Sequence, residues 1–239
     1  MKRLLDLVFA GGALLLTSPI LLAVGAAIFL YDFHNPLYIA RRVGREGKLF
    51  RMVKFRSMVV NADRTGVTST SAADSRITPV GGFVRKFKLD ELVQLWNVFI
   101  GDMSLVGPRP NVPSGVAVYT DVEQRLLVVR PGITDFASVV FADEGDILKG
   151  HPDADEAYDR LIRPWKSRLG LFYIDHRSAW VDMRVIFLTV LTLFSRQAAL
   201  RGIHGLLLQL GAPPDLARVA LRRDQLTPQR PPGSNLLVG

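Results

Sequence analysis

Two adjacent carboxylates, Asp90 and Glu91, stand at the start of a helix-like segment and are surrounded in the sequence by basic residues. Arg85 and Lys88 precede the pair, and a Gly-Pro-Arg-Pro segment at 107–110 follows the helix. Free N–H groups at a helix N-terminus, together with nearby cations, suit a phosphate. Carboxylates among cations could hold a divalent metal ion, or one could act as a nucleophile on phosphorus. The spacing therefore predicts a phosphate-handling site around this pair.

A purely structural role for the same pair stays open, because acidic residues in the first turn of a helix complement its dipole. The helix is predicted over residues 89–100, where large apolar residues recur at helical spacing and define one buried face. These residues are Leu92, Leu95, Trp96 and Phe99. Both roles require this helix to present Asp90 and Glu91 at its N-terminal end.

Basic residues also gather in three other short segments, at residues 41–47, 54–58 and 130–132. Lys54 and Arg56 follow a strand-like run, and Arg130 opens a rigid turn with the Pro-Gly that follows it. Each segment alone is typical of a solvated turn. Together they indicate a binding site for a polyanion.

The globular part of the chain is predicted to be a mixed, helix-rich α/β fold. From residue 31 to about residue 175, short β-type runs alternate with helical stretches. The predicted strands are residues 36–41, 49–55, 104–106 and 139–141. Residues 61–75 are polar and aperiodic, and indicate an exposed loop.

Residues 7–30 are free of charged side chains and are long enough to cross a bilayer core. A cleaved signal peptide is disfavoured, because Asp6 is out of place in its basic start and the apolar run is too long. Ser18 and Pro19 lie in the middle of the run. Proline removes a backbone hydrogen bond and kinks a helix, and the Ser18 hydroxyl can satisfy a freed backbone group.

Both flanks of this apolar segment are basic. Lys2 and Arg3 precede it, and seven Lys or Arg residues follow it between residues 41 and 56. Since positive residues mark the cytoplasmic side of a membrane, both flanks are assigned to that side. We therefore favour a re-entrant helix, broken at Ser18-Pro19, over a helix that spans the bilayer.

Two later segments are predicted to be amphipathic helices in the headgroup plane. Residues 161–173 combine Arg163, Lys166 and Arg168 with Trp165, the composition of an interfacial helix. Residues 185–194 are apolar but too short to span, and here an interfacial helix and a buried core helix both stay open. From residue 212 the chain has no apolar period, and we expect this tail to be partly mobile.

Composition bounds the class of protein. The chain has 239 residues, with 49% hydrophobic and 22% charged, which excludes global disorder. A mean hydropathy of +0.21 and a net charge of +8 suggest apolar surface and an anionic partner such as lipid headgroups, phosphates or nucleic acid. The absence of cysteine excludes disulfides, thiolate metal sites and a cysteine nucleophile.

The order of these motifs resembles that of the bacterial sugar transferases known as small monotopic phosphoglycosyl transferases. The resemblance covers roughly residues 1–200. It is carried by the segments 2–6, 18–19, 54–58, 89–92, 96–98, 101–104, 107–110 and 130–134.

The resemblance implies an enzyme that transfers a sugar-1-phosphate from a nucleotide diphosphate sugar, UDP-linked by expectation, to polyprenol (undecaprenyl) phosphate. It implies that Asp90 attacks the sugar-bearing phosphate, forms an aspartyl-phosphosugar intermediate and releases UMP, and that Glu91 helps to hold Mg²⁺. Asp90 and Glu91 are thus the implied catalytic and metal-binding residues. The implied substrate-binding residues are Lys54, Arg56, Arg85, Pro108, Arg109, Pro110 and Arg130.

The implied organisation has three parts: a re-entrant membrane helix (1–31), a catalytic domain with interfacial helices (32–200) and a C-terminal extension (201–239). Such an enzyme would sit in the bacterial inner membrane, with its catalytic domain on the cytoplasmic face, and act in glycoconjugate or exopolysaccharide synthesis. Its partners would be the two substrates and membrane lipids, without nucleic acid, and a homodimer is allowed.

One stretch departs from the family pattern. After residue 134 many members read Gly-Trp-Ala-Gln-Val and then Gly-Arg, whereas this chain is more acidic and lacks the arginine. Asp143 and Glu144 are the added acids, and both a substrate contact and an ordinary acidic loop stay open for them. The departure removes any family-based prediction of the sugar.

Two other classes of function compete with this one. A membrane-tethered nucleic-acid-binding module is compatible with the charge, but no helix-turn-helix, zinc or RNA-recognition signature is present. A non-catalytic scaffold for polysaccharide assembly would not need the intact Asp90-Glu91 pair.

Overall fold

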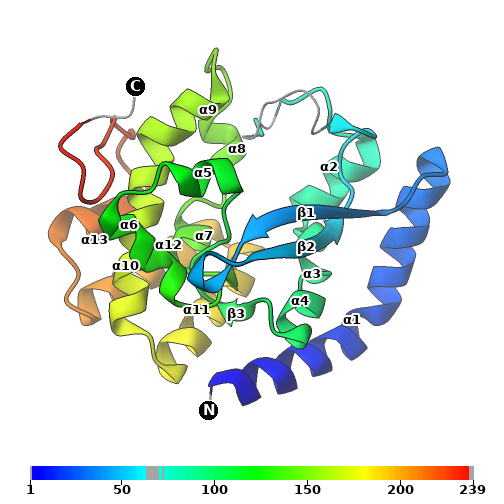
Figure 1. Ribbon diagram of the computed structural model, residues 1–239, viewed down its shortest axis with the longest axis horizontal. Helices are drawn as coiled ribbons and strands as arrows, with labels where there is room; N and C mark the ends of the chain where they lie inside the picture. The colour runs from blue at the N-terminus through cyan, green and yellow to red at the C-terminus, as the bar shows by residue number, and fades with distance from the viewer. Residues whose placement is uncertain (1, 63–69, 72, 237–239) are drawn as a thin grey trace.

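The computed structural model describes residues 2–62, 70–71 and 73–236 (Figure 1). A long helix, α1 (Lys2–Asp32), lies along one side of a body made of short helices and two small sheets. The strands are β1 (Leu37–Val43), β2 (Leu49–Phe55), β3 (Ser104–Val106) and β4 (Gly132–Thr134). The helices after α1 are α2 (Pro79–Lys86), α3 (Leu89–Leu92), α4 (Leu95–Ile100), α5 (Pro113–Ala117), α6 (Asp121–Gln124), α7 (Phe136–Val140), α8 (Glu144–Ile147), α9 (Ala154–Ala157), α10 (Arg163–His176), α11 (Ala179–Thr192), α12 (Arg196–Gln209) and α13 (Pro214–Ala220). Single turns at Arg45–Gly47, Arg125–Val128 and Tyr158–Ile162 complete the described elements. The predicted mixed, helix-rich α/β class is confirmed.

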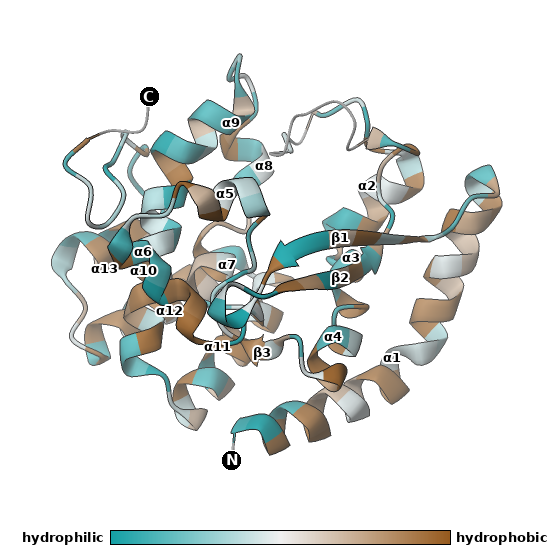
Figure 2. Cartoon of the chain, in the orientation of Figure 1, coloured by the Kyte–Doolittle hydropathy of each residue, from teal (hydrophilic) through white to brown (hydrophobic). Residues whose placement is uncertain are grey.

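Helix α1 is continuous through Ser18 and Pro19, and Figure 1 shows it changing direction along its length. Pro19 has no amide hydrogen to donate to the carbonyl of Leu15, and the Ser18 hydroxyl donates to that carbonyl instead, at 2.8 Å. The predicted rescue of a freed backbone group is therefore confirmed, although the helix does not stop at the proline. The helix is long and apolar enough to cross a membrane, and Figure 2 shows its hydrophobic residues on the outside of the molecule.

Both ends of α1 are fastened to the globular body. At the start, Lys2 forms an ion pair with Asp182 of α11, and Arg3 donates to the last carbonyls of α4. The buried Asp6 accepts hydrogen bonds from the Ser104 hydroxyl (2.9 Å) and from the backbone at the start of β3. At the far end, two nitrogens of Arg56 contact the two oxygens of Asp32, each at 2.6 Å. The helix is thus held against one body at both ends.

The hairpin of β1 and β2 is antiparallel, with Leu37 opposite Phe55. The outer edge of β2 is covered by a side chain instead of a strand. The fully buried Asn97 of α4 accepts from the Val53 amide (2.9 Å) and donates to the Arg51 carbonyl (2.7 Å). Because an amide side chain carries both a donor and an acceptor, it can replace one residue of a neighbouring strand. This contact fixes α4 beside the hairpin.

The second sheet pairs β3 and β4 in parallel, with Ser104 opposite Gly132. The two backbones approach so closely that a Cβ on Gly132 would overlap the backbone of Gly107, and one on Gly107 would lie 2.6 Å from the Arg130 carbonyl oxygen. The Gly-Pro-Arg-Pro and Arg-Pro-Gly segments are therefore packed against each other.

The main core lies between α7, α10, α11, α12 and α13. Two smaller clusters pack α1 against the hairpin, α2 and α4. Three predicted strands are confirmed as β1, β2 and β3 within one or two residues, but residues 139 and 140 belong to helix α7 and Phe141 is its C-cap. A short apolar run is ambiguous by periodicity alone, and here Asp135 caps the helix by accepting from the Ser138 amide at 2.7 Å.

The prediction that residues 161–173 form an interfacial helix is wrong. Helix α10 lies in the core, where Arg163 is 3% exposed and forms an ion pair with the fully buried Glu123 at 3.0 Å. Trp165 is also buried, and Lys166 pairs with Glu144. Arg163 and Lys166 are thus paired with protein carboxylates, and Arg168 donates to a backbone carbonyl.

Residues 185–194 were predicted to form either an interfacial helix or a buried core helix, and they are buried on one side only. Val185 and Leu188 of α11 are buried, whereas the opposite face of the helix is exposed and apolar. That exposed face consists of Trp180, Met183, Phe187 and Val190, and Phe194, just past the end of the helix, is exposed as well.

The expectation of an aperiodic tail after residue 212 is wrong for α13, since Leu216, Ala217 and Ala220 are buried. Beyond α13, the Arg230 carbonyl accepts from Arg168 at 2.8 Å. The residues past the predicted catalytic domain therefore pack against it. The predicted loop at 61–75 lies mostly outside the described residues.

The close approach of β3 and β4 predicts that Gly132→Ala destabilises the fold by about 3 kcal/mol or more, because the added methyl group forces the two backbones apart. Gly205→Ala in α12 is the matched control. Its Cβ would meet nothing within 4 Å, and helix propensity predicts a gain of about 1 kcal/mol. Thermal unfolding in detergent measures both, and a Gly132→Ala protein as stable as the parent would contradict this packing.

Candidate active site

The Asp90-Glu91 pair lies on α3, a helix of only four residues that packs against β2. Lys88 precedes α3 with φ of 55°, in the left-handed region, so the chain turns sharply between α2 and α3. The helix predicted over residues 89–100 is interrupted at residues 93–94, so it forms two short helices, α3 and α4. A four-residue helix does not supply the extended dipole that the sequence suggested, so charge at this site comes from side chains.

Asp90 lies in a field of cations but has no partner of its own. Its Oδ1 atom is buried and has no hydrogen-bond partner among the described residues. Burial, and then the charge of Glu91, raise the pKa of Asp90 above its usual range, while Lys54, Lys88 and Arg85 oppose that rise. An unpartnered buried carboxylate oxygen is costly, which indicates a group kept available for a ligand or a reaction.

Glu91 is held by Arg109, with Oε1 of the glutamate 2.9 Å from Nη2 of the arginine. Burial acts to raise the pKa of Glu91, but Arg109, Lys88 and Lys54 together outweigh it and the net shift is downward. Arg109 also donates to the Ile133 carbonyl at 3.0 Å, beside the tightly packed β3 and β4. The two glycines that let these strands approach therefore also position the arginine.

Lys54 is the third member of the cluster and lies on β2 opposite Tyr38 of β1. Its ammonium is 5.4 Å from the centre of the tyrosine ring. Burial lowers the pKa of Lys54 to about 8, with the charge of Arg42 next in importance, and Asp90 opposes the shift. Such a lysine is a cation at neutral pH and loses its charge just above it.

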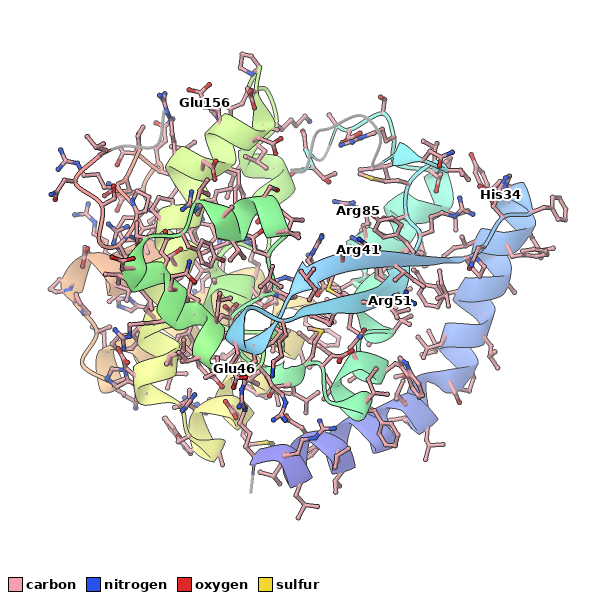
Figure 3. The ribbon with its side chains drawn as sticks, viewed as in Figure 1. His34, Arg41, Glu46, Arg51, Arg85 and Glu156 are labelled. Carbon is pink, nitrogen blue, oxygen red and sulfur yellow. The ribbon has the colours of Figure 1, made fainter. Side chains whose placement is uncertain are left out.

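The structure thus gathers Lys54, Arg85, Asp90, Glu91 and Arg109 around one site. Figure 3 shows Arg85 at the end of α2, above the β1–β2 hairpin. The charges of Lys54 and Arg85 act on Asp90, and those of Arg109 and Lys54 act on Glu91.

Two predicted substrate-binding residues have other partners. Arg56 pairs with Asp32 at the end of α1, and the Arg130 Nε donates to the Gly101 carbonyl at 3.0 Å. Both arginine side chains connect separate elements of the fold, and these contacts are with the protein itself. Pro108 and Pro110 flank Arg109 along a small hollow that Tyr119 also lines.

Arg42 and Lys166 also belong to this charge cluster, and the sequence did not single them out as site residues. Arg42 shares the hairpin face of Tyr38 by strand alternation, and its charge acts on Lys54. A period-two analysis of the hairpin could have found it. Lys166 lies some 110 residues from the hairpin in sequence, and no local pattern indicates its place.

The donor set at this site suits Mg²⁺ that shares its coordination with substrate. Among the described residues no group of three or more His, Cys, Asp or Glu side chains could hold a metal ion alone. Mg²⁺ usually takes one or two carboxylates and completes its shell with water and substrate phosphates. The unpartnered Oδ1 of Asp90 and the adjacent Glu91 fit that mode.

The chain belongs to the bacterial sugar transferase family, whose model matches residues 1–196. It is 35% identical over 201 residues to a UDP-glucose:undecaprenyl-phosphate glucose-1-phosphate transferase of Klebsiella pneumoniae, covering 83% of this chain and 41% of the relative.

Two further relatives carry names with other sugars. The chain is 35% identical over 197 residues to a UDP-N-acetylgalactosamine-undecaprenyl-phosphate N-acetylgalactosaminephosphotransferase of Aeromonas hydrophila (81% and 44% covered). It is 34% identical over 214 residues to an undecaprenyl-phosphate galactose phosphotransferase of Salmonella typhimurium (83% and 41% covered). The chain spans about two fifths of the length of these relatives.

The environment of Lys54 predicts an amine that titrates with a midpoint of about 8, because burial and Arg42 disfavour its charge. Asp90→Asn should lower that midpoint further, since it removes the anion that favours the charged form. Competitive acylation of the amine as a function of pH, read by peptide mass spectrometry, measures both. A midpoint near the ordinary lysine value of 10.5 would contradict the burial of this side chain.

Proposed function

We propose that this protein transfers a sugar-1-phosphate from a UDP-sugar to undecaprenyl phosphate, with Asp90 as the nucleophile. One observation carries the assignment: Asp90 keeps a buried oxygen without a partner, surrounded by Lys54, Arg85 and Lys88. The names of the relatives support the two substrates. Phosphoryl transfer depends mainly on positioning and on charge neutralisation, and this site offers cations for both.

The reaction proceeds by two displacements. A carboxylate oxygen of Asp90 forms a bond to the sugar-bearing phosphorus, and the bond from that phosphorus to the bridging oxygen breaks, so UMP leaves with the electron pair. A phosphate oxygen of the polyprenol phosphate then attacks the same phosphorus. The bond to Asp90 breaks and the carboxylate is regenerated. Because the nucleotide leaves before the lipid phosphate reacts, substrates from water and from the bilayer use one site in turn.

The cations divide the work of holding the diphosphate. Arg85 and the protonated Lys54 neutralise phosphate oxygens, and Arg109, already paired with Glu91, donates its remaining N–H groups to them. Pro108 and Pro110 shape the side of the site that receives the nucleotide. Mg²⁺, held by Asp90 and Glu91, would supply further charge stabilisation for the phosphate oxygens.

We also propose that the protein is monotopic in the inner membrane, with its N-terminus and catalytic part both on the cytoplasmic face. The fastening of both ends of α1 to one body supports this arrangement, because a 31-residue straight helix would reach about 46 Å. Such a helix, if it spanned the bilayer, would carry one end away from that body. The exposed apolar face of α11 offers a second contact with lipid.

Asp90→Asn should lower the rate of transfer by roughly 10³-fold or more, because the amide keeps the shape and loses the nucleophile. Glu91→Gln should reduce turnover less, since Gln still accepts a hydrogen bond from Arg109. Its defect should shrink as the Mg²⁺ concentration is raised, because Glu91 is proposed to help hold the metal ion. UMP release from purified protein, UDP-sugar, polyprenol phosphate and Mg²⁺ measures both.

Asp175→Asn is the control for a carboxylate outside the cluster, since Asp175 forms an exposed pair with Arg125. It should retain the parent rate. Near-normal turnover by Asp90→Asn would assign the nucleophile elsewhere.

Pro19→Leu should straighten α1 and shift the protein towards a spanning topology, because it restores the backbone hydrogen bond to Leu15. Labelling of a single cysteine placed next to the N-terminus, by a reagent confined to the periplasm, should be absent in the parent and present in the variant. Labelling of the parent would contradict the re-entrant arrangement.

A further inference from the structure

The acidic turn that departs from the family pattern places two neighbouring carboxylates in different surroundings. Asp143 faces the C-terminal part of the chain, with Arg196 at 2.7 Å and Arg222 at 3.7 Å. Arg222 also lies over the ring of Phe141, 5.4 Å from its centre. Because Arg222 lies beyond the matched family region, the extension helps to fix this turn from outside the catalytic part.

Glu144, the first residue of α8, has a different partner. It forms an ion pair with Lys166 of α10, whose ammonium lies 5.1 Å from the centre of the Tyr158 ring. The side chains of Glu144 and Lys166 are 31% and 22% exposed, so a ligand can reach the pair. Of the two carboxylate oxygens of Glu144, Oε2 is the one that contacts Lys166.

The cations of the site connect Glu144 to the catalytic pair. Lys166, and then Arg109 and Lys88, act against burial to lower the pKa of Glu144, and Arg109 and Lys88 also lower the pKa of Glu91. Arg109 is therefore in direct contact with Glu91 on α3, and it also feels the charges of Asp135 and of Glu144 on α8.

The phosphate-binding groups leave one side of the site for the sugar. In the reaction proposed above, Lys54, Arg85 and Arg109 hold the diphosphate, and the hollow lined by Pro108 and Tyr119 takes the nucleotide. The sugar is attached to the phosphate that Asp90 attacks. Two further carboxylates act on Arg109: Asp135, which is buried and accepts from the Ser138 amide, and Glu144, which is partly exposed together with Lys166.

We propose that Glu144, oriented by Lys166, contacts hydroxyl groups of the donor sugar and determines which sugar is accepted. The proposal rests on the function proposed above and deepens it. A carboxylate accepts hydrogen bonds from sugar hydroxyls, the ammonium donates to their oxygens, and Tyr158 adds an aromatic surface. The substrate class is a UDP-hexose that has a free hydroxyl where Glu144 reaches it.

The physical basis of selection is the cost of an unmatched polar group. A site that hydrogen-bonds a substrate hydroxyl rejects a sugar lacking it, because the protein carboxylate then loses water without gaining a partner. The relatives act on different sugars by name, so selection among them needs residues outside the shared motifs.

The test compares Glu144→Gln with Asp143→Asn, its neighbour of equal charge. UDP-glucose, UDP-galactose and their two 2-acetamido counterparts serve as donors, and UDP serves as a competitor that lacks the sugar. We expect Glu144→Gln to raise KM for the best donor by roughly tenfold or more and to change the order of preference. The inhibition constant for UDP should stay within about twofold. Asp143→Asn should lower the unfolding temperature and keep the parent order of preference.

Three results would overturn the proposal. Unchanged KM and preference in Glu144→Gln would exclude a sugar contact. A parallel rise in KM and in the inhibition constant for UDP would show that Glu144 acts through Arg109 on the phosphates. A change of preference in Asp143→Asn equal to that in Glu144→Gln would show an effect of the turn as a whole.

A binding measurement separates failure of this proposal from failure of the proposed function. Calorimetry compares the affinity of the parent for its best UDP-sugar with its affinity for UDP, without any lipid acceptor. A gain from the sugar that Glu144→Gln loses supports the contact even if no transfer is observed. A parent that binds UDP-sugar no better than UDP contradicts it.

Discussion

The ion pair between Arg109 and Glu91 is the contact on which the site depends. It joins α3, beside the hairpin, to the segment that follows β3, and the close packing of Gly107 against Gly132 sets the position of the arginine. Because Arg109 is occupied by Glu91, it does not neutralise Asp90 directly. The adjacent carboxylate is left with an unpartnered oxygen in a field of cations. One of the two neighbouring acids is thus held by the arginine, and the other keeps an oxygen without a partner among the described residues.

The contacts of α1 give this site its relation to the membrane. The same helix that carries the exposed apolar surface holds β3 through Asp6 and holds β2 through Asp32 and Arg56. Both strands lead directly into the site, β2 to Lys54 and β3 to Arg109. Any shift of α1 would therefore move Lys54 and Arg109, the two cations at the ends of these strands. This coupling suits an enzyme whose second substrate has a phosphate at the membrane surface.

Much of the site could be predicted from local sequence, since Asp90, Glu91, Arg109 and Lys54 all lie in short motifs. The strands at 49–55 and 104–106 were also predicted, because their apolar patterns are regular. Arg56 and Arg130 were assigned to the substrate from their basic segments and their place in the family motifs, but their partners, Asp32 and the Gly101 carbonyl, come from distant segments. The same limit explains α10. Its basic and aromatic composition resembles that of an interfacial helix, but Glu123 and Glu144 fold over it and neutralise its cations.

The central claim is that Asp90 becomes covalently bonded to the phosphosugar. The most direct measurement is intact-protein mass spectrometry after incubation with UDP-sugar and Mg²⁺ in the absence of polyprenol phosphate, followed by peptide mapping. The account predicts a mass increase equal to one sugar phosphate, located on the peptide that contains Asp90 and removed when polyprenol phosphate is added. A full turnover with no adduct at any time under rapid quenching, or an adduct on another residue, would contradict it.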